Sequence, residues 1–327
     1  MKGIPHKTST GLEYTEFAIP KKNGKVRRIF APSPELLQVQ QVMLPTFNRV
    51  LSDIEKKEGI QNIFHGFVKD RNPVTAATEH IGYDLTLMMD ISNFFDSVTG
   101  DHILNISELV HSTRRQLEQC LHFQEGEGGF TAQGFATSPI LANICITPIV
   151  KEIQEYLDTK FKDRYAFTIY ADDIQISINS SDFIPETERI IDIVSYLFES
   201  EGFEINQNKT RIRHAKFGHR RILGVNVGDD KLYASRKTIR KIRAARHQKN
   251  GPSLGGLITW SKCMLPKNLR PERPKVGTGL KELSSLMYSG ELNPEQTVQI
   301  ASHIVNATSH YTDRRSMEDL RGSLQLN

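Results

Sequence analysis

The sequence predicts an α+β fold that combines an antiparallel sheet with helices, and three observations support this prediction. Residues 167–178 alternate apolar and polar side chains around Asp172 and Asp173, which predicts a hairpin of two half-buried strands. Residues 85–91 form an apolar run that delivers Asp90 near its end, which is typical of a short buried strand. Amphipathic helices are indicated where apolar residues recur at helical spacing, at residues 34–51, 138–153 and 183–201.

The length and composition are those of a globular protein. The 327 residues suffice for two domains or one large multi-lobed domain, and 38% hydrophobic with 24% charged residues is ordinary for such chains. No run of about 18 apolar residues is present, and the N-terminus lacks the apolar core of a signal peptide. Cys120, Cys145 and Cys263 are far apart and odd in number, so they predict no disulfide framework. We therefore expect a cytoplasmic protein with no membrane partner.

Positive charge is concentrated in one stretch of the chain. The formal net charge is only +4, but residues 205–250 contain fourteen Lys or Arg against two acids, Asp229 and Asp230. Within this stretch, Ser235 is a helix cap, and the helix that follows has a narrow apolar stripe. Its other faces are basic and predict contacts with nucleic-acid phosphates through Arg236, Lys237, Arg240, Lys241 and Arg243. A merely solubilising basic surface is the alternative interpretation.

The paired carboxylates are the strongest chemical signal. Asp172 and Asp173 lie at the tip of the predicted hairpin, where like charges destabilise each other unless cations neutralise them. Two divalent cations bound by carboxylate oxygens, about 3.5–4 Å apart, can activate a hydroxyl and stabilise a leaving pyrophosphate. Asp90 at the end of its strand suits a third ligand. The alternative is a solvated Asp-Asp turn.

Basic residues elsewhere are candidates for binding phosphate groups. Asn23-Gly24 predicts a two-residue hairpin turn within residues 19–32, and the hairpin would carry several cations able to clamp a triphosphate. A solvated basic hairpin is equally compatible with this block. Lys209, which follows the third helix and a short strand, either neutralises a leaving pyrophosphate or is an ordinary surface lysine.

Taken together, these blocks resemble a reverse transcriptase. The resemblance covers residues 21–227, and the motifs occur in the family's order: Lys22-Asn23-Gly24-Lys25-Val26-Arg27-Arg28, Asp90-Ile91-x-x-x-Phe95, Gln133-Gly134-x-x-x-Ser138-Pro139, Tyr170-Ala171-Asp172-Asp173, Gly202…Asn206…Lys209 and Leu223-Gly224.

The resemblance implies a right-hand polymerase with fingers, an antiparallel palm with helices, and a helical thumb. The implied boundaries are residues 1–80 for the fingers (with part of 100–132), 81–228 for the palm, and 229–327 for the thumb and a C-terminal RNA-binding region. Two Mg²⁺ ions, with Mn²⁺ as a possible substitute, would be bound by Asp90, Ile91, Asp172 and Asp173. The nucleotide, a dNTP, would be bound by Lys22, Arg27, Phe95, Gln133 and Lys209, with Phe95 excluding a ribose 2′-hydroxyl. Leu223 and Gly224 would form the primer grip.

Among bacterial reverse transcriptases the chain is similar to the retron type. The run Gln-Gly-x-x-x-Ser-Pro-x-Leu-Ala-Asn fits, and residues 77–80 resemble the retron Asn-Ala-x-x-His element, although Ala76 replaces its Asn. Leu223 stands where retron enzymes usually have the Thr of Val-Thr-Gly. The resemblance implies a cognate structured noncoding RNA, priming from an RNA 2′-hydroxyl, a branched RNA–DNA product (msDNA), and a defence effector protein as partner in anti-phage defence.

Two alternatives stay open from the sequence. One is a non-retron bacterial reverse transcriptase, either another defence enzyme or a relative of the group II intron enzymes. The other is an inactive RNA-binding protein that keeps the same fold.

Overall fold

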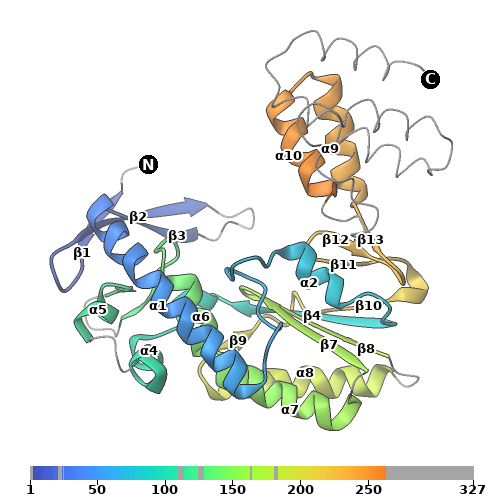
Figure 1. Ribbon diagram of the computed structural model, residues 1–327, viewed down its shortest axis with the longest axis horizontal. Helices are drawn as coiled ribbons and strands as arrows, with labels where there is room; N and C mark the ends of the chain where they lie inside the picture. Colours follow the sequence, from blue (N-terminus) through green and yellow to red (C-terminus); the bar gives the residue numbers. More distant parts are fainter. Residues whose placement is uncertain are drawn as a thin grey trace, which may run out of the picture. The chain divides into compact units, whose positions relative to one another are not determined.

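The computed structural model describes residues 3–20, 24, 26–109, 114–123, 129–162, 164–179 and 183–262. Contacts divide the chain into two compact units, Met1–Gly218 and His219–Asn327, and each is considered by itself (Figure 1). No helix in the described residues is long and apolar enough to cross a membrane.

An antiparallel sheet forms the centre of the first unit. Its strand order is β10-β4-β8-β7, with β9 pairing along the same edge of β4 as β10: β4 (Leu85–Ser92), β7 (Tyr165–Tyr170), β8 (Asp173–Ile178), β9 (Glu204–Ile205) and β10 (Arg211–His214). The predicted strands at residues 85–91 and 167–178 are confirmed. The combination of this sheet with helices also confirms the α+β prediction.

The two faces of the sheet differ, because successive side chains of a strand point to opposite sides. Met89, Ile174 and Ile169 are cross-strand partners on the apolar face, and all are buried. On the other face Thr86 pairs with Ser177, and Asp90 pairs with Asp173. The alternation therefore places two of the candidate catalytic carboxylates on the polar face.

Helices pack against this sheet and against one another. Figure 1 shows α7 and α8 side by side beneath β7 and β8, and contacts join α7 to β7, α2 to β7 and α1 to α6. The helices of this unit are α1 (Pro34–Glu58), α2 (Pro73–Glu79), α3 (Phe94–Ser97), α4 (Gly100–Leu104), α5 (Arg114–Glu118), α6 (Ser138–Cys145), α7 (Thr147–Phe161) and α8 (Phe183–Ser200), with one 3₁₀ turn, η1 (Ser107–Leu109), and another, η2 (Ala215–Phe217).

Local sequence explains where the helices begin and end. Ser33 caps α1 by accepting a hydrogen bond from the Leu36 amide, and Gly59 ends it with φ 72°. The helix thus continues to Glu58 rather than ending near residue 51, and it accommodates Pro45 in its interior. The predicted helix over residues 138–153 is instead two helices, because Pro148 cannot donate the next helical hydrogen bond. The N-cap residue of α6 is Thr137. Ser138, whose residue type is also common at N-caps, is the first helical residue, and its hydroxyl donates to the Ala132 carbonyl.

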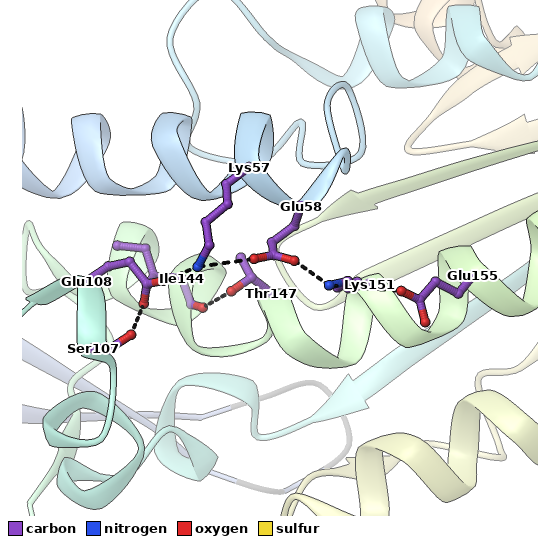
Figure 2. A network of polar contacts seen from close by, with 8 residues as sticks. All are labelled: Lys57, Glu58, Ser107, Glu108, Ile144, Thr147, Lys151 and Glu155. Carbon is purple, nitrogen blue, oxygen red and sulfur yellow. Dashed lines mark hydrogen bonds and ion pairs between the residues drawn. The ribbon is translucent and has the colours of Figure 1, made fainter.

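Charged side chains join three of these elements (Figure 2). Glu58, at the end of α1, forms ion pairs with its neighbour Lys57 and with Lys151 of α7. The Lys57 ammonium also lies 3.2 Å from a carboxylate oxygen of Glu108 in η1. Ser107 donates to Glu108 over 2.8 Å. This network ties α1 to the start of α7, at the break that follows α6.

A second sheet, β1-β2-β3, carries the predicted basic hairpin. Its strands are β1 (Ile4–Lys7), β2 (Glu13–Pro20) and β3 (Val26–Pro32), and a short hairpin of β5 (Leu121–His122) and β6 (Phe130–Thr131) accompanies them. The hairpin is confirmed, since β2 and β3 pair from Tyr14 opposite Pro32 to Pro20 opposite Val26. Of the predicted turn, Gly24 has a φ of 79°, and Asn23 lies outside the described residues.

The second unit consists of a small sheet followed by two helices in its described part. The elements are β11 (Arg220–Ile222), β12 (Val225–Val227), β13 (Leu232–Tyr233), α9 (Arg236–His247) and α10 (Gly251–Lys262). Ser235 caps α9 by accepting from the Thr238 amide, as expected from the sequence. Residues 221–227 are a strand-like run in the sequence, but they belong to a hairpin that turns at Leu223-Gly224, where φ is 49° and 86°.

Candidate active site

The three candidate carboxylates meet where β4 approaches the β7–β8 turn. Asp90 of β4 lies directly opposite Asp173, the first residue of β8. Asp172 belongs to the turn itself, and its carbonyl accepts a hydrogen bond from the Ile91 amide over 2.8 Å. Main-chain pairing on both strands therefore fixes where the three acids lie.

The turn that carries Asp172 is tight and strained. Tyr170 pairs with Asp173, so only Ala171 and Asp172 connect the strands, and Ala171 has a φ of 56°. Glycine usually occupies a position with such a φ, because a Cβ makes it unfavourable. Gly66 lies directly against this turn: a Cβ at Gly66 would be 2.5 Å from the Ala171 nitrogen. No local sequence pattern indicates this contact between Gly66 and the turn, because the two are about a hundred residues apart.

Burial and mutual repulsion raise the pKa of two of these acids. Desolvation is the largest cause for Asp173, followed by the charges of Asp172 and Asp90, and together they raise its pKa to about 6. The pKa of Asp172 is also raised, again mainly by desolvation. Deprotonated carboxylates at this site thus need compensating positive charge.

Lys209 supplies part of that charge. Its ammonium donates to both carboxylate oxygens of Asp90, over 2.7 and 2.8 Å. The Asp90 side chain is only 10% exposed, whereas that of Lys209 is 60% exposed. Lys209 was predicted to lie near a triphosphate or to be an ordinary surface lysine; the structure pairs it with the candidate metal ligand Asp90 while much of its side chain stays exposed.

Of the described basic hairpin residues, Arg27 is near enough to the site for its charge to act on Asp172. Arg27 is exposed on β3, and its charge is one of those that lower the pKa of Asp172. The neighbouring Arg28 points elsewhere and pairs with Glu16, with a nitrogen–oxygen distance of 2.6 Å. Lys22 lies outside the described residues.

Gln133 and Phe95 lie on segments that flank the sheet. Gln133 is half-buried, and its carbonyl accepts from the Phe30 amide of β3 over 2.8 Å. Next to it, Gly134 approaches Phe30 so closely that a Cβ would lie 2.3 Å from the Phe30 oxygen. Phe95 of α3 is half-buried, while the preceding Phe94 is part of the core. The ring of Phe95 also contacts Phe67, an exposed residue whose role was not predicted.

The donor atoms of the site fit magnesium or manganese. Carboxylate oxygens are hard ligands of the kind that Mg²⁺ and Mn²⁺ prefer. The Ile91 side chain is a buried hydrocarbon without a donor atom, so only the main-chain carbonyl of this residue could contribute as a ligand. In the described part of the chain no three His, Cys, Asp or Glu side chains form a ready-made metal cluster. Metal binding would therefore require the Lys209 ammonium to give up at least one Asp90 oxygen.

The predicted nucleic-acid contacts of the second unit are exposed. Thr238, Ile242 and Ala245 are the buried residues of α9, and the five predicted cations lie on its exposed faces: Arg236, Lys237, Arg240, Lys241 and Arg243. Leu223 and Gly224 form the two-residue turn between β11 and β12.

Comparison with known families agrees with this site. Residues 19–241 match the profile of the family described as reverse transcriptase (RNA-dependent DNA polymerase), and the chain belongs to that family.

Its curated relatives include retron reverse transcriptases, which confirms the predicted resemblance. The Mx65 retron enzyme of Myxococcus xanthus is 29% identical over 279 residues, covering 78% of this chain and 62% of the relative. The Mx162 enzyme of the same organism is 28% identical and is covered over 53% of its length. The Ec86 enzyme of Escherichia coli is 28% identical over 244 residues, covering 72% of this chain and 70% of the relative. The chain thus spans little more than half the length of the two Myxococcus relatives.

Solved structures with this fold include two telomerases. Telomerase from Candida albicans, in complex with a fragment of telomeric RNA, has a TM-score of 0.56 at 12% identity and covers all of this chain and 65% of that one. Apo telomerase from Candida tropicalis has a TM-score of 0.52 at 14% identity, covering 98% and 61%. With the family match, these likenesses confirm the right-hand polymerase fold.

Proposed function

We propose that the protein is an RNA-directed DNA polymerase that copies part of a cognate structured noncoding RNA into single-stranded DNA. One observation carries this proposal: Asp90 and Asp173 pair on the polar face of the sheet, and Asp172 lies in the adjoining turn, in a chain of the reverse transcriptase family. In a solvated Asp-Asp turn the acids would face water. Three acids held together away from water cost free energy, and such an arrangement is typical of functional sites.

Each residue of the site has a distinct task in this reaction. The three carboxylates, with the Ile91 carbonyl, would hold two Mg²⁺ ions, which activate the primer hydroxyl and stabilise the leaving pyrophosphate when bound. Arg27, whose charge reaches Asp172, and Lys22 bind the triphosphate of the incoming dNTP. Gln133 contacts the nucleotide or the template. Lys209 holds Asp90 in place before metal binding, and afterwards its ammonium is available to the triphosphate.

Phe95 is proposed to exclude ribonucleotides. Phe95 lies five residues after Asp90, and its half-buried ring contacts Phe67, which in turn contacts Tyr170 next to the turn that carries Asp172. A ring at this place would collide with a 2′-hydroxyl, which a deoxyribose lacks. Selection of dNTPs would then be steric.

The retron relatives support a finer proposal about partners. The RNA would provide both template and the priming 2′-hydroxyl, the product would be msDNA, and a defence effector protein would complete the system in the cytoplasm. Leu223-Gly224 would act as the primer grip and the α9 cations would contact nucleic-acid phosphates. Fingers at residues 1–80, palm at 81–228 and thumb from 229 are the subdomains that this assignment implies.

Replacement of Asp172 by Asn tests the catalytic assignment. We expect primer extension on an RNA template to fall by about a hundredfold or more, because a metal ligand contributes several kcal/mol to transition-state stabilisation. Bound RNA should be retained. Asp192→Asn, an exposed acid on α8, is the matched control and should keep wild-type activity. Undiminished extension by Asp172→Asn would refute the proposed catalytic role.

Sequencing of copurified nucleic acid tests the retron assignment. The gene should be expressed in bacteria with its native flanking DNA, and half of the nucleic acid should be treated with a debranching enzyme. A short DNA joined to RNA through a 2′–5′ bond is expected. Unbranched DNA would identify a non-retron reverse transcriptase, and bound RNA without any DNA would favour an inactive RNA-binding protein.

A further inference from the structure

Phe67 is an unusual residue beside the candidate active site. Its side chain is 49% exposed, and its backbone has a φ of 61°. A bulky residue in the left-handed region is a genuine outlier, and such conformations persist only where surrounding contacts impose them. An exposed aromatic ring on a strained backbone therefore needs an explanation other than burial.

The backbone leading to Phe67 is fastened to the strand that carries the catalytic turn. The His65 amide donates to the Ile169 carbonyl, and the Ile169 amide donates to the Ile63 carbonyl, each over 2.8 Å. The buried Asn143 side chain donates to the Gly66 carbonyl over 2.9 Å. Gly66 itself touches the turn without room for a Cβ. A movement of residues 63–67 would thus shift the turn at Ala171, and a movement of the turn would shift residues 63–67.

The Phe67 ring joins two residues of the site. It lies edge-to-face against Phe95, with ring centroids 6.3 Å apart, and tilted against Tyr170 at 6.4 Å. Phe95 also contacts the core residue Phe94, with ring centroids 5.6 Å apart. The Phe95 ring therefore contacts both the core and Phe67.

We propose that Phe67 is a positioning residue for sugar selection. Its ring holds the Phe95 ring in the place where Phe95 would meet the 2′ position of the incoming nucleotide. This inference depends on the proposed function of Phe95. It accounts for both unusual features, since the left-handed backbone places the ring against Phe95 and Tyr170 while about half of the side chain stays exposed. Removal of the ring leaves Phe95 free to rotate away, which admits ribonucleotides.

A double-mutant cycle with single-nucleotide incorporation tests the inference. The measured quantity is the ratio of kcat/KM for a dNTP to kcat/KM for the matching ribonucleotide, in wild type, Phe67→Ala, Phe95→Ala and the double variant. We expect Phe95→Ala to lower this ratio strongly and Phe67→Ala to lower it about three- to tenfold, the range that loss of an aromatic pair corresponds to. Phe67→Ala should add nothing in the Phe95→Ala background, because it acts through Phe95.

Two further variants separate positioning from folding. Phe67→Gly removes the ring and relieves the positive φ, so it should lower the ratio without lowering the melting temperature. Phe67→Tyr keeps the ring and should restore discrimination. Phe123→Ala, which removes another partly exposed Phe, is the control and should leave the ratio unchanged.

The possible failures are distinguishable. No incorporation by the wild type would refute the polymerase function together with this inference. An unchanged ratio in Phe95→Ala would refute the role of Phe95 and the inference, while leaving the polymerase intact. A lowered ratio in Phe95→Ala, with no change in Phe67→Ala and Phe67→Gly, would overturn the inference alone.

Discussion

Asp173 shows how much the site costs the protein when no cation is bound. Its carboxylate is desolvated and lies near two other acids, which raises its pKa to about 6. The unfolded chain would give the same group a pKa of about 3.9. The folded state therefore binds this proton more tightly than the unfolded state, and the resulting stability is lost as pH rises from about 4 to about 6.

Asp173→Asn should remove this loss. In EDTA, we expect the variant to exceed the wild type in free energy of unfolding by about 1–2 kcal/mol at pH 8, with the difference shrinking towards pH 4. Urea unfolding at a series of pH values measures both proteins. If the difference in free energy of unfolding stays constant between pH 4 and 8, the folded protein does not raise the pKa of the Asp173 carboxyl.

The α9 helix is the element on which a nucleic-acid contact can be tested separately from catalysis. Its cations are exposed, and only Thr238, Ile242 and Ala245 are buried, so charge reversal at exposed positions should leave its packing intact.

Arg240→Glu combined with Lys241→Glu should weaken RNA binding and its dependence on salt. Each phosphate contact that is lost reduces the slope of log affinity against log salt by about 0.7–0.9, so we expect a slope shallower by roughly 1–2. Filter binding over a range of salt concentrations gives this slope. Lys160→Glu with Arg189→Glu, on α7 and α8, is the matched control. An unchanged slope in the α9 variant would exclude this helix from the interface.

His80, the histidine of the retron-like element, lies at the C-terminal end of α2 and is fully buried. Its two ring nitrogens lie 2.8 Å from the hydroxyls of Ser177 and Thr168. It therefore joins α2 to β7 and β8, in the sheet that carries Asp90 and Asp173. Thr78 and Glu79 of the same element are exposed, so within this element a direct contact with a partner is open to them and not to His80.

For the whole molecule, metal binding and folding should be linked. A ligand at ten times its dissociation constant stabilises the folded state by about 1.4 kcal/mol. We expect Mg²⁺ to raise the melting temperature of the wild type and of Asp192→Asn, and to do so less in Asp90→Ala. Thermal scans with Mg²⁺ and with EDTA provide the comparison. Equal shifts in wild type and Asp90→Ala would argue against Asp90 as a ligand.

The sequence predicted the elements that depend on local pattern. Alternation around Asp172 and the apolar run before Asp90 identified the strands, and their chemistry identified the acids. It could not reveal contacts between distant residues: Lys209 meets Asp90 across 119 positions, and Gly66 meets the turn at Ala171. Backbone conformation is also not visible in the pattern: Leu223 stands in a strand-like run of residues, yet it turns with a φ of 49°. Periodicity reports which face is buried, and it is insensitive to a break such as that between α6 and α7.

The position of β4 in the sheet has a consequence during protein synthesis. All strands that pair with it, β8, β9 and β10, are translated later. At about 5–20 residues per second, the first of these partners leaves the ribosome several seconds after β4. During that interval an apolar strand waits without hydrogen-bonding partners, and a nascent chain that stops before Asp173 can never bury it. Truncated products of this gene should therefore depend on chaperones or be degraded, whereas a chain that includes β8 pairs Asp173 with Asp90 and so brings these two candidate acids together.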